Sequence, residues 1–152
     1  MSRGRRSAWS WLFAAAAALA VVAAIRFAEA LPSGPEPIAW DREACAHCHM
    51  HVGEPRFAAQ VQLADGQVAN FDDPGCMVRY LDERRPAVHA VYVHHLSDER
   101  WLLLRDAAFL AGQTTPMGYG LGAVDASTPG ALTLDAARMH IAQPRAAAGG
   151  LP

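Results

Sequence analysis

The spacing of hydrophobic and polar residues predicts short strands followed by a helix in the first half of the domain. Apolar and polar positions alternate over residues 57–63 and 68–71, as expected of half-buried strands. Asp65-Gly66 lies between them and favours a hairpin turn, because glycine accepts a positive φ. Residues 72–74 (Asp-Asp-Pro) then predict a helix start, with aspartate as N-cap and proline in the first turn, for a helix over residues 75–81.

The second half of the domain shows a similar order. It predicts strands at residues 87–93 and 101–104, separated by a polar turn at 94–100. A short helix at 106–110, a glycine-rich loop at 114–122 and a last helix at 133–141, capped by Thr133, are expected to follow. We therefore expect an α+β domain made of two small ββα units, at about residues 45–85 and 86–145.

The start of the chain has the pattern of an export signal. Three arginines among the first six residues precede an almost entirely apolar run, residues 8–25, and residues 28–30 (Ala-Glu-Ala) fit a signal-peptidase site. The run also reaches the length of a membrane span, about 17–25 residues. We expect residues 1–30 to be a cleaved signal peptide or a single membrane anchor, with the rest outside the cytoplasmic membrane. Because no cysteine precedes Cys45, the protein is not expected to be a lipoprotein.

After residue 30, a proline-rich linker is expected at residues 31–44, a metal-binding domain at 45–145 and a tail at 146–152.

The charge and the cysteine count of the chain exclude some classes of protein. The chain carries 13 basic residues, all arginine, and 15 acidic ones, for a net charge of -2. This balance does not provide the basic face of a nucleic-acid-binding protein. Three cysteines cannot form a fully paired disulfide framework.

Residues 45–51 (Cys-Ala-His-Cys-His-Met-His) carry the chemistry of this sequence. Two thiols, three imidazoles and a thioether occur within seven residues. Such ligands favour copper(I), zinc or haem iron over magnesium or calcium. A disulfide between Cys45 and Cys48 is the alternative without a metal.

The residues alone leave three metal sites open. The first is c-type haem, since Cys45 to His49 match C-x-x-C-H, with His49 as proximal and Met117 as distal ligand. The second is a zinc-binding structural module, in which Cys45, Cys48 and Cys76 with one histidine would complete a tetrahedral site. The third is copper(I), a soft cation that accepts thiolate and thioether together. Its ligands would be Cys48 and Met50, joined by Met77 or Met117.

An ordered set of motifs then resembles the NosL family, the copper(I) chaperones that serve nitrous oxide reductase. The motifs are CAHCHM, PRFAAQ, FDDPGCMVRY and TPMGYGL, which start at residues 45, 55, 71 and 115. The resemblance implies a fold of two ββα units outside the cytoplasmic membrane and a carrier rather than an enzyme. It implies copper(I) binding by Cys48 and Met50, with Met117 and Cys45 as further ligands. The implied partners are copper-supplying proteins and a client copper enzyme, nitrous oxide reductase first.

The sequence also departs from this family. The first cluster is rich in histidine (His47, His49 and His51), and His94-His95 stand where the family usually has an aspartate. These histidines would add ligands or tune copper release, although a solvated turn also explains the second pair. Cys76-Met77 begin the helix after the aspartates, where a helix N-terminus lowers a thiol pKa and makes a competent ligand; the alternative is a place in the core. The missing lipid anchor leaves another exported copper enzyme as an alternative client.

Overall fold

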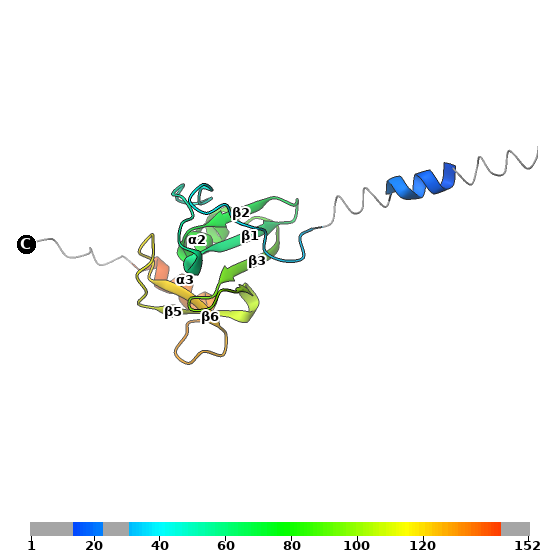
Figure 1. Ribbon diagram of the computed structural model, residues 1–152. Helices are drawn as coiled ribbons and strands as arrows, with labels where there is room; N and C mark the ends of the chain where they lie inside the picture. Colours follow the sequence, from blue (N-terminus) through cyan, green and yellow to red (C-terminus); the bar gives the residue numbers. More distant parts are fainter. Residues whose placement is uncertain (1–13, 23–30, 144–152) are drawn as a thin grey trace, which may run out of the picture. The chain divides into compact units, whose positions relative to one another are not determined.

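A computed structural model describes residues 14–22 and 31–143 (Figure 1). Contacts divide the chain into residues 1–31 and residues 32–152, and each part is described by itself. In the first part, residues 14–22 are helical. The rest of the expected signal or anchor, and the expected tail at 146–152, lie outside the described residues. Within the described ranges, no helix combines the length and apolar character that a membrane crossing requires.

The second part is built on a four-stranded antiparallel sheet. The strands are β1 (Ala59–Leu63), β2 (Val68–Phe71), β3 (Val88–His94) and β4 (Trp101–Leu103), in the order β2-β1-β3-β4. The predicted hairpin between β1 and β2 is confirmed, and Gly66 takes a φ of +87° at its turn. The alternation starts later than expected, because Pro55–Phe57 form a 3-10 turn, η1.

Helix α2 (Pro74–Arg84) follows β2 and starts as the sequence predicts. Asp73 is the N-cap, and its Oδ1 accepts a hydrogen bond from the Gly75 N–H at 2.8 Å. Pro74 occupies the first turn, where its missing N–H costs nothing. The helix runs three residues past the predicted end and stops at Arg85, which adopts a left-handed φ of +46°.

The second ββα unit differs from the expectation. β3 pairs with β1 and β4 pairs with β3 in the first sheet, so they are not the two strands of the second unit. The predicted helix at 106–110 is wrong: it is strand β5 (Ala107–Ala111), preceded by a 3-10 turn, η2 (Leu104–Asp106). β5 pairs with β6 (Leu121–Asp125), which the sequence did not indicate. Helix α3 (Leu134–Ala142) follows with Thr133 as N-cap, as predicted.

Tertiary pairing explains this correction. An alanine-rich segment has no strong strand preference of its own. Phe109, however, is fully buried, and its backbone exchanges two hydrogen bonds with Leu132 on one side while β6 pairs on the other. The observed ββα units are therefore β1-β2-α2 and β5-β6-α3, with β3 and β4 added to the sheet of the first.

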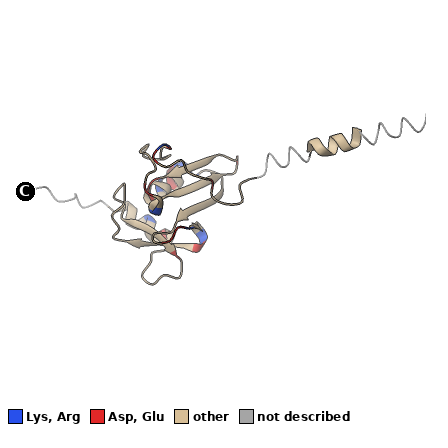
Figure 2. Ribbon diagram, in the orientation of Figure 1, with Lys and Arg blue, Asp and Glu red and all other residues tan. Residues whose placement is uncertain are grey.

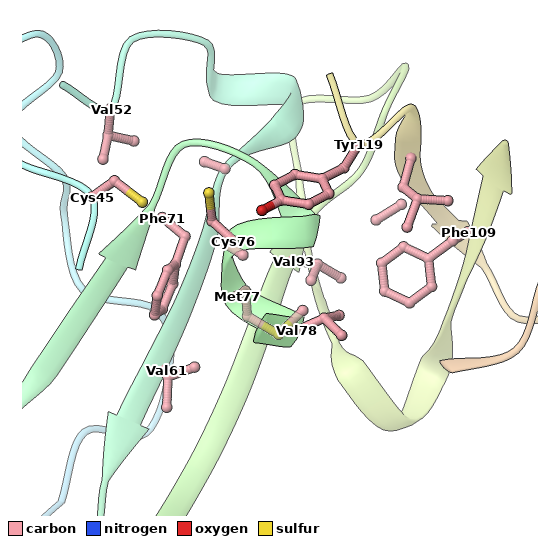
Figure 3. Close-up of a cluster of buried hydrophobic side chains, with 14 of the residues drawn as sticks. Cys45, Val52, Val61, Phe71, Cys76, Met77, Val78, Val93, Phe109 and Tyr119 are labelled. Atoms are coloured by element: carbon pink, nitrogen blue, oxygen red, sulfur yellow. The ribbon is translucent and has the colours of Figure 1, made fainter. Parts of the chain in front are cut away.

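Helix α2 connects these units, because it packs against β1, β2 and β6. Its first turn is buried in a core that includes Val61, Phe71, Val93 and Leu121 (Figure 3). Figure 3 places Met77 on the side of α2 turned away from Cys76, toward Val61 and Val78. The core thus accounts for Met77 and leaves the Cys76 side of the helix facing the loop before β1.

The expected linker has no regular structure but is docked. Gln60 and Gln62 point to the same face of β1 and are buried there. Gln60 exchanges hydrogen bonds with the backbone N–H and C=O of Glu36 at 2.8 and 3.0 Å, and Gln62 donates to the Gly34 C=O at 2.6 Å. Residues 34–38 therefore belong to the folded unit rather than to a free tether.

Candidate metal centre

The loop that carries the cysteines is closed by its own backbone. The Cys45 N–H donates to the Met50 C=O at 2.7 Å, and the His49 N–H donates to the Cys45 C=O at 3.0 Å. Ala44 and His51 form an antiparallel bridge at its base. His49 turns the chain with a φ of +64°, a left-handed conformation rare for residues other than glycine. The loop is therefore a compact turn with defined side-chain directions.

Three thiols converge on one point. The Sγ atoms of Cys45, Cys48 and Cys76 all lie within 4.8 Å of one another, and all three thiols are free. Cys45 and Cys76 are fully buried, whereas Cys48 is only partly covered. Figure 3 shows Cys76 in the first turn of α2, with its sulfur directed toward Cys45. Cys76 is 28 positions from Cys48 and 31 from Cys45 in the sequence, yet the three form one group of soft ligands.

The surroundings of Cys45 favour an anionic sulfur. The Cys76 thiol donates to it and lowers the pKa of Cys45 to about 4, in opposition to burial, which raises the pKa. The backbone N–H groups of Cys48, Asp72 and His47 also donate to this sulfur and lower its pKa. The pKa of Cys76 is raised, because its proton is shared with Cys45 and because it is buried. Burial raises the pKa of Cys48 as well.

The Met117 loop is tied to this centre through Asp73. The Met117 N–H donates to Asp73 Oδ2 at 3.1 Å, while Oδ1 of the same carboxylate caps α2. The Thr115 side chain also hydrogen-bonds to Asp73, and its Oγ1 accepts from the Gly120 N–H at 3.1 Å. One buried carboxylate thus connects the glycine-rich loop with the helix that presents Cys76. The Met117 side chain is half-buried and packs against the core.

A second contact also holds this loop in place. The Tyr119 ring lies directly over Gly75, so that a Cβ at Gly75 would be 2.1 Å from the ring carbon Cγ. Only glycine fits at this point in the first turn of α2. In Figure 3 the Tyr119 hydroxyl points to the region of Cys76.

The remaining residues of the first cluster lie outside the group of three sulfurs. Met50 is 59% exposed. In the described ranges, no histidine has a ring nitrogen in that group. His49 and His51 are exposed, and His47 Nδ1 lies 3.8 Å from Glu83 Oε2 of α2. The structure therefore brings Cys45 and Cys48 to Cys76 and leaves the methionine at the surface.

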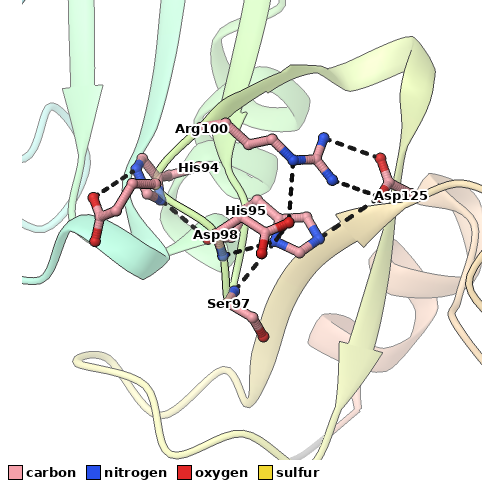
Figure 4. A network of polar contacts seen from close by, with 7 residues as sticks. His94, His95, Ser97, Asp98, Arg100 and Asp125 are labelled. Carbon is pink, nitrogen blue, oxygen red and sulfur yellow. Dashed lines mark hydrogen bonds and ion pairs between the residues drawn. The ribbon is translucent and has the colours of Figure 1, made fainter.

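His94 and His95 are not in a solvated turn (Figure 4). Both are buried, His94 at the end of β3 and His95 after it. His95 Nδ1 accepts hydrogen bonds from the N–H groups of Ser97 and Asp98 at 3.2 and 3.1 Å, and His94 Nδ1 lies 3.1 Å from the His95 C=O. These rings organise the connection between β3 and β4, and each has one nitrogen engaged in that task.

Comparison of this sequence with protein-family models identifies its family. A model named NosL matches residues 38–140, which include the thiol loop, α2 and the Met117 loop. The chain belongs to the NosL family. No curated protein matches it. Among solved structures, the NosL fold of this chain resembles the crystal structure of the copper chaperone NosL from Shewanella denitrificans. The TM-score is 0.52 at 21% sequence identity, covering 72% of this chain and 87% of that chain.

The geometry of this NosL domain favours a single soft cation. A zinc site of three cysteines and one histidine would need a ring nitrogen beside the sulfurs, and the described residues bring none into the group. Covalent haem would need the sulfurs of Cys45 and Cys48 to be directed to two separate vinyl groups. Here they converge on Cys76 instead. Three converging thiols form a group of soft ligands that could hold a metal ion.

Two residues of this centre have only weak signals in the sequence. For Cys76 the signal is its place in the first turn of a helix. For Asp73 it is the pattern of a helix cap. Its second role depends on a loop 44 residues away, for which no local pattern exists.

Proposed function

We propose that this protein is an exported carrier of copper(I) that loads a copper enzyme outside the cytoplasmic membrane. The observation that carries the proposal is the convergence of three free thiols within 4.8 Å in a NosL domain. The copper chaperone title of the similar structure and the signal-like pattern of residues 1–30 support it. The proposed ligands are Cys48, Met50, Met117 and Cys45.

Transfer would proceed by ligand exchange. Cys48 is partly exposed and Met50 is exposed, so groups of a client can approach copper held there. A client thiolate or imidazole would replace one ligand at a time, so that copper(I) never leaves as a free ion. A thioether carries no charge and no proton, and it is therefore the ligand most easily replaced.

Copper(I) titration of the reduced full chain against a chromophoric competitor, without oxygen, tests the binding. We expect about one equivalent of tightly bound, colourless copper(I). Cys48→Ser should weaken binding by more than about 100-fold, because even loss of a group that supports a metal ligand costs about 10–100-fold. Unchanged affinity in Cys48→Ser, or the Soret band of a haem protein, would overturn the proposal.

Two exposed methionines provide a matched pair. Met50 lies in the thiol loop, whereas Met139 on α3 is 65% exposed and lies outside the motifs of the centre. Met50→Leu should change the rate at which a competitor takes copper(I) from the protein, while Met139→Leu should leave that rate unchanged. Equal effects would show that Met50 is not a ligand.

The client proposed first is the copper cluster of nitrous oxide reductase. In cells that lack this protein, the reductase should be exported and folded but deficient in copper at that cluster. Supply of the wild-type chain should restore copper, and supply of Cys48→Ser should not. A fully loaded reductase in its absence would indicate the alternative client, another exported copper enzyme.

A further inference from the structure

We infer that the domain holds copper(I) in two positions that share Cys48: an outer position with Met50 and Met117, and an inner position with Cys45 and Cys76. The inference rests on the proposed function and adds to it a place where the cargo is kept between loading and delivery. The two positions differ in the depth and the charge of their ligands.

Depth separates the ligands first. Cys45 and Cys76 have 0% exposed surface, whereas Met50 is 59% exposed. Cys48 lies between these extremes, and its sulfur belongs to the group of three. The Met50 C=O accepts a hydrogen bond from the Cys45 N–H at 2.7 Å, which closes the loop. Cys48 is therefore the ligand that serves both sides.

The spacing of the sulfurs fits a cation. A metal–sulfur bond of about 2.3 Å places two sulfurs about 4.0 Å apart in a three-coordinate site and about 4.6 Å apart in a linear one. The three Sγ atoms lie within 4.8 Å of one another, so side-chain rotations that shift each sulfur by a few tenths of an ångström would bring all three into bonding distance of one cation. Both geometries are ones that copper(I) accepts.

The inner position offers only sulfur ligands. Cys76 lies in the first turn of α2, and its sulfur forms one group with those of Cys45 and Cys48. All three bind a soft cation as thiolates. Thiolates, which carry charge, also bind copper(I) more strongly than a neutral thioether does, so the inner position is the preferred one.

The movement between positions needs no redox reaction. Copper enters as copper(I) and stays copper(I). Inward movement breaks the bonds from copper to the Met50 and Met117 thioethers and forms bonds to the Cys45 and Cys76 sulfurs, while the bond to Cys48 persists. Any thiol proton on Cys45 or Cys76 is released to water as its sulfur binds the cation. Outward movement reverses these steps, and a client then meets copper only through Cys48 and Met50.

Selenomethionine labelling separates the two positions. X-ray absorption at the copper edge distinguishes selenium from sulfur neighbours, and every methionine of the labelled chain carries selenium. The reduced full chain, with three free thiols confirmed by titration, receives one equivalent of copper(I) without oxygen. We expect a shell of sulfur alone in the wild type. Copper–selenium scattering in the wild type would overturn the inference, and this result does not depend on any variant.

The variant Cys76→Ser then tests the inner ligand. We expect selenium to enter the copper shell and a chromophoric competitor to remove copper faster by about tenfold or more, a change in the range for lost support of a ligand. Circular dichroism confirms folding, and Met139→Leu is the control that should leave the rate unchanged. A folded Cys76→Ser with unchanged spectrum and rate would overturn the inner position. Absence of copper(I) binding in the wild type would instead overturn the proposed function.

Discussion

At the scale of single residues, the centre depends on side chains with an unusual backbone or an unusual charge state. His49 takes a φ of +64° between Cys48 and Met50. Such a conformation costs an L-residue about 1–2 kcal/mol, and glycine avoids this cost. This strain accompanies a turn that directs the Cys48 sulfur toward the other thiols and leaves the Met50 sulfur at the surface.

Replacement of His49 by glycine should stabilise the metal-free protein. Relief of the strain, less the extra entropy of glycine in the unfolded chain, predicts a gain of about 0.5–1 kcal/mol. Urea unfolding of the reduced protein measures it, and copper(I) affinity should be unchanged. His51→Gly is the matched control, since His51 lies in a bridge and gains nothing from glycine. A fall in copper affinity in His49→Gly alone would make His49 a ligand.

Two aspartates should leave opposite signatures in the pH dependence of stability. Burial raises the pKa of the Asp73 carboxyl above 3.8, whereas the hydrogen bond from Arg100 lowers the pKa of Asp125 below it. The folded state therefore takes up a proton at Asp73 above pH 3.8, and the penalty of its buried charge disappears on acidification. At Asp125 the stabilisation is present above pH 3.8 and is lost as the pH falls through the lowered pKa.

The measurement compares each variant with the metal-free wild type. Relative to Asp73→Asn, the free energy of unfolding of the wild type should rise as the pH falls from neutral to about 4. Relative to Asp125→Asn, it should fall below about pH 4. Urea unfolding at closely spaced pH values provides both curves. Differences that change with pH in the same direction would contradict the assignment.

At the scale of elements, the first turn of α2 is the structure on which the centre is built. It presents Cys76, accepts the Asp73 cap and lies under the Tyr119 ring. Because α2 also packs against β1, β2 and β6, the two hairpins meet at this helix. A change at this turn therefore affects the thiols and the Met117 loop together.

Gly75→Ala tests this junction. The added Cβ would overlap the Tyr119 ring at 2.1 Å, so the ring and its loop must move. We expect a loss of about 1–3 kcal/mol in stability, the usual cost of overpacking, together with weaker copper(I) binding. Gly34→Ala is the control, since its Cβ would meet nothing within 4 Å. Stability equal to the wild type, measured by urea unfolding, would refute the contact.

The elements also show what the sequence could and could not predict. The β1-β2 hairpin and both helix caps were found, because Asp65-Gly66, Asp73-Pro74 and Thr133 act through neighbours in the chain. β5 and β6 were missed, because each strand is defined by its partner rather than by its own composition. The thiol loop is evident from the sequence because its residues, 45–51, are neighbours in the chain. The approach of Cys76 and the Asp73 bond to the Met117 loop are not, because they join residues far apart in the chain.

At the scale of the whole second part, polar contacts extend the domain beyond the residues that bind metal. Acidic and basic positions are interspersed along the described chain (Figure 2), and several are paired across elements, as Arg138 of α3 is with Asp82 of α2 at 3.0 Å. The docked residues 34–38 cover buried glutamines on β1. The unit is therefore longer than its motifs.

Two truncations should measure this extension. A chain that starts at Pro32 should unfold with the same free energy as the longer chain, because contacts divide there. A chain that starts at Ala39 loses the three hydrogen bonds of Gln60 and Gln62 to residues 34 and 36 and should lose about 1.5–4.5 kcal/mol, since each bond is worth about 0.5–1.5 kcal/mol. Urea unfolding provides the comparison. Equal stability of the two truncated chains would show that the segment is not part of the fold.

The bond between Asp73 and the Met117 loop also has a consequence for biosynthesis. A polypeptide emerges from the ribosome with its N-terminus first, so Cys45, Cys48 and Cys76 emerge before Met117 does. Until residues 77–117 have also emerged, the thiols are present without the Met117 loop that hydrogen-bonds to Asp73 at the start of α2. This interval is when the nascent chain is most open to oxidation or to the wrong metal, and it is when a thiol-protecting factor would be most useful to it.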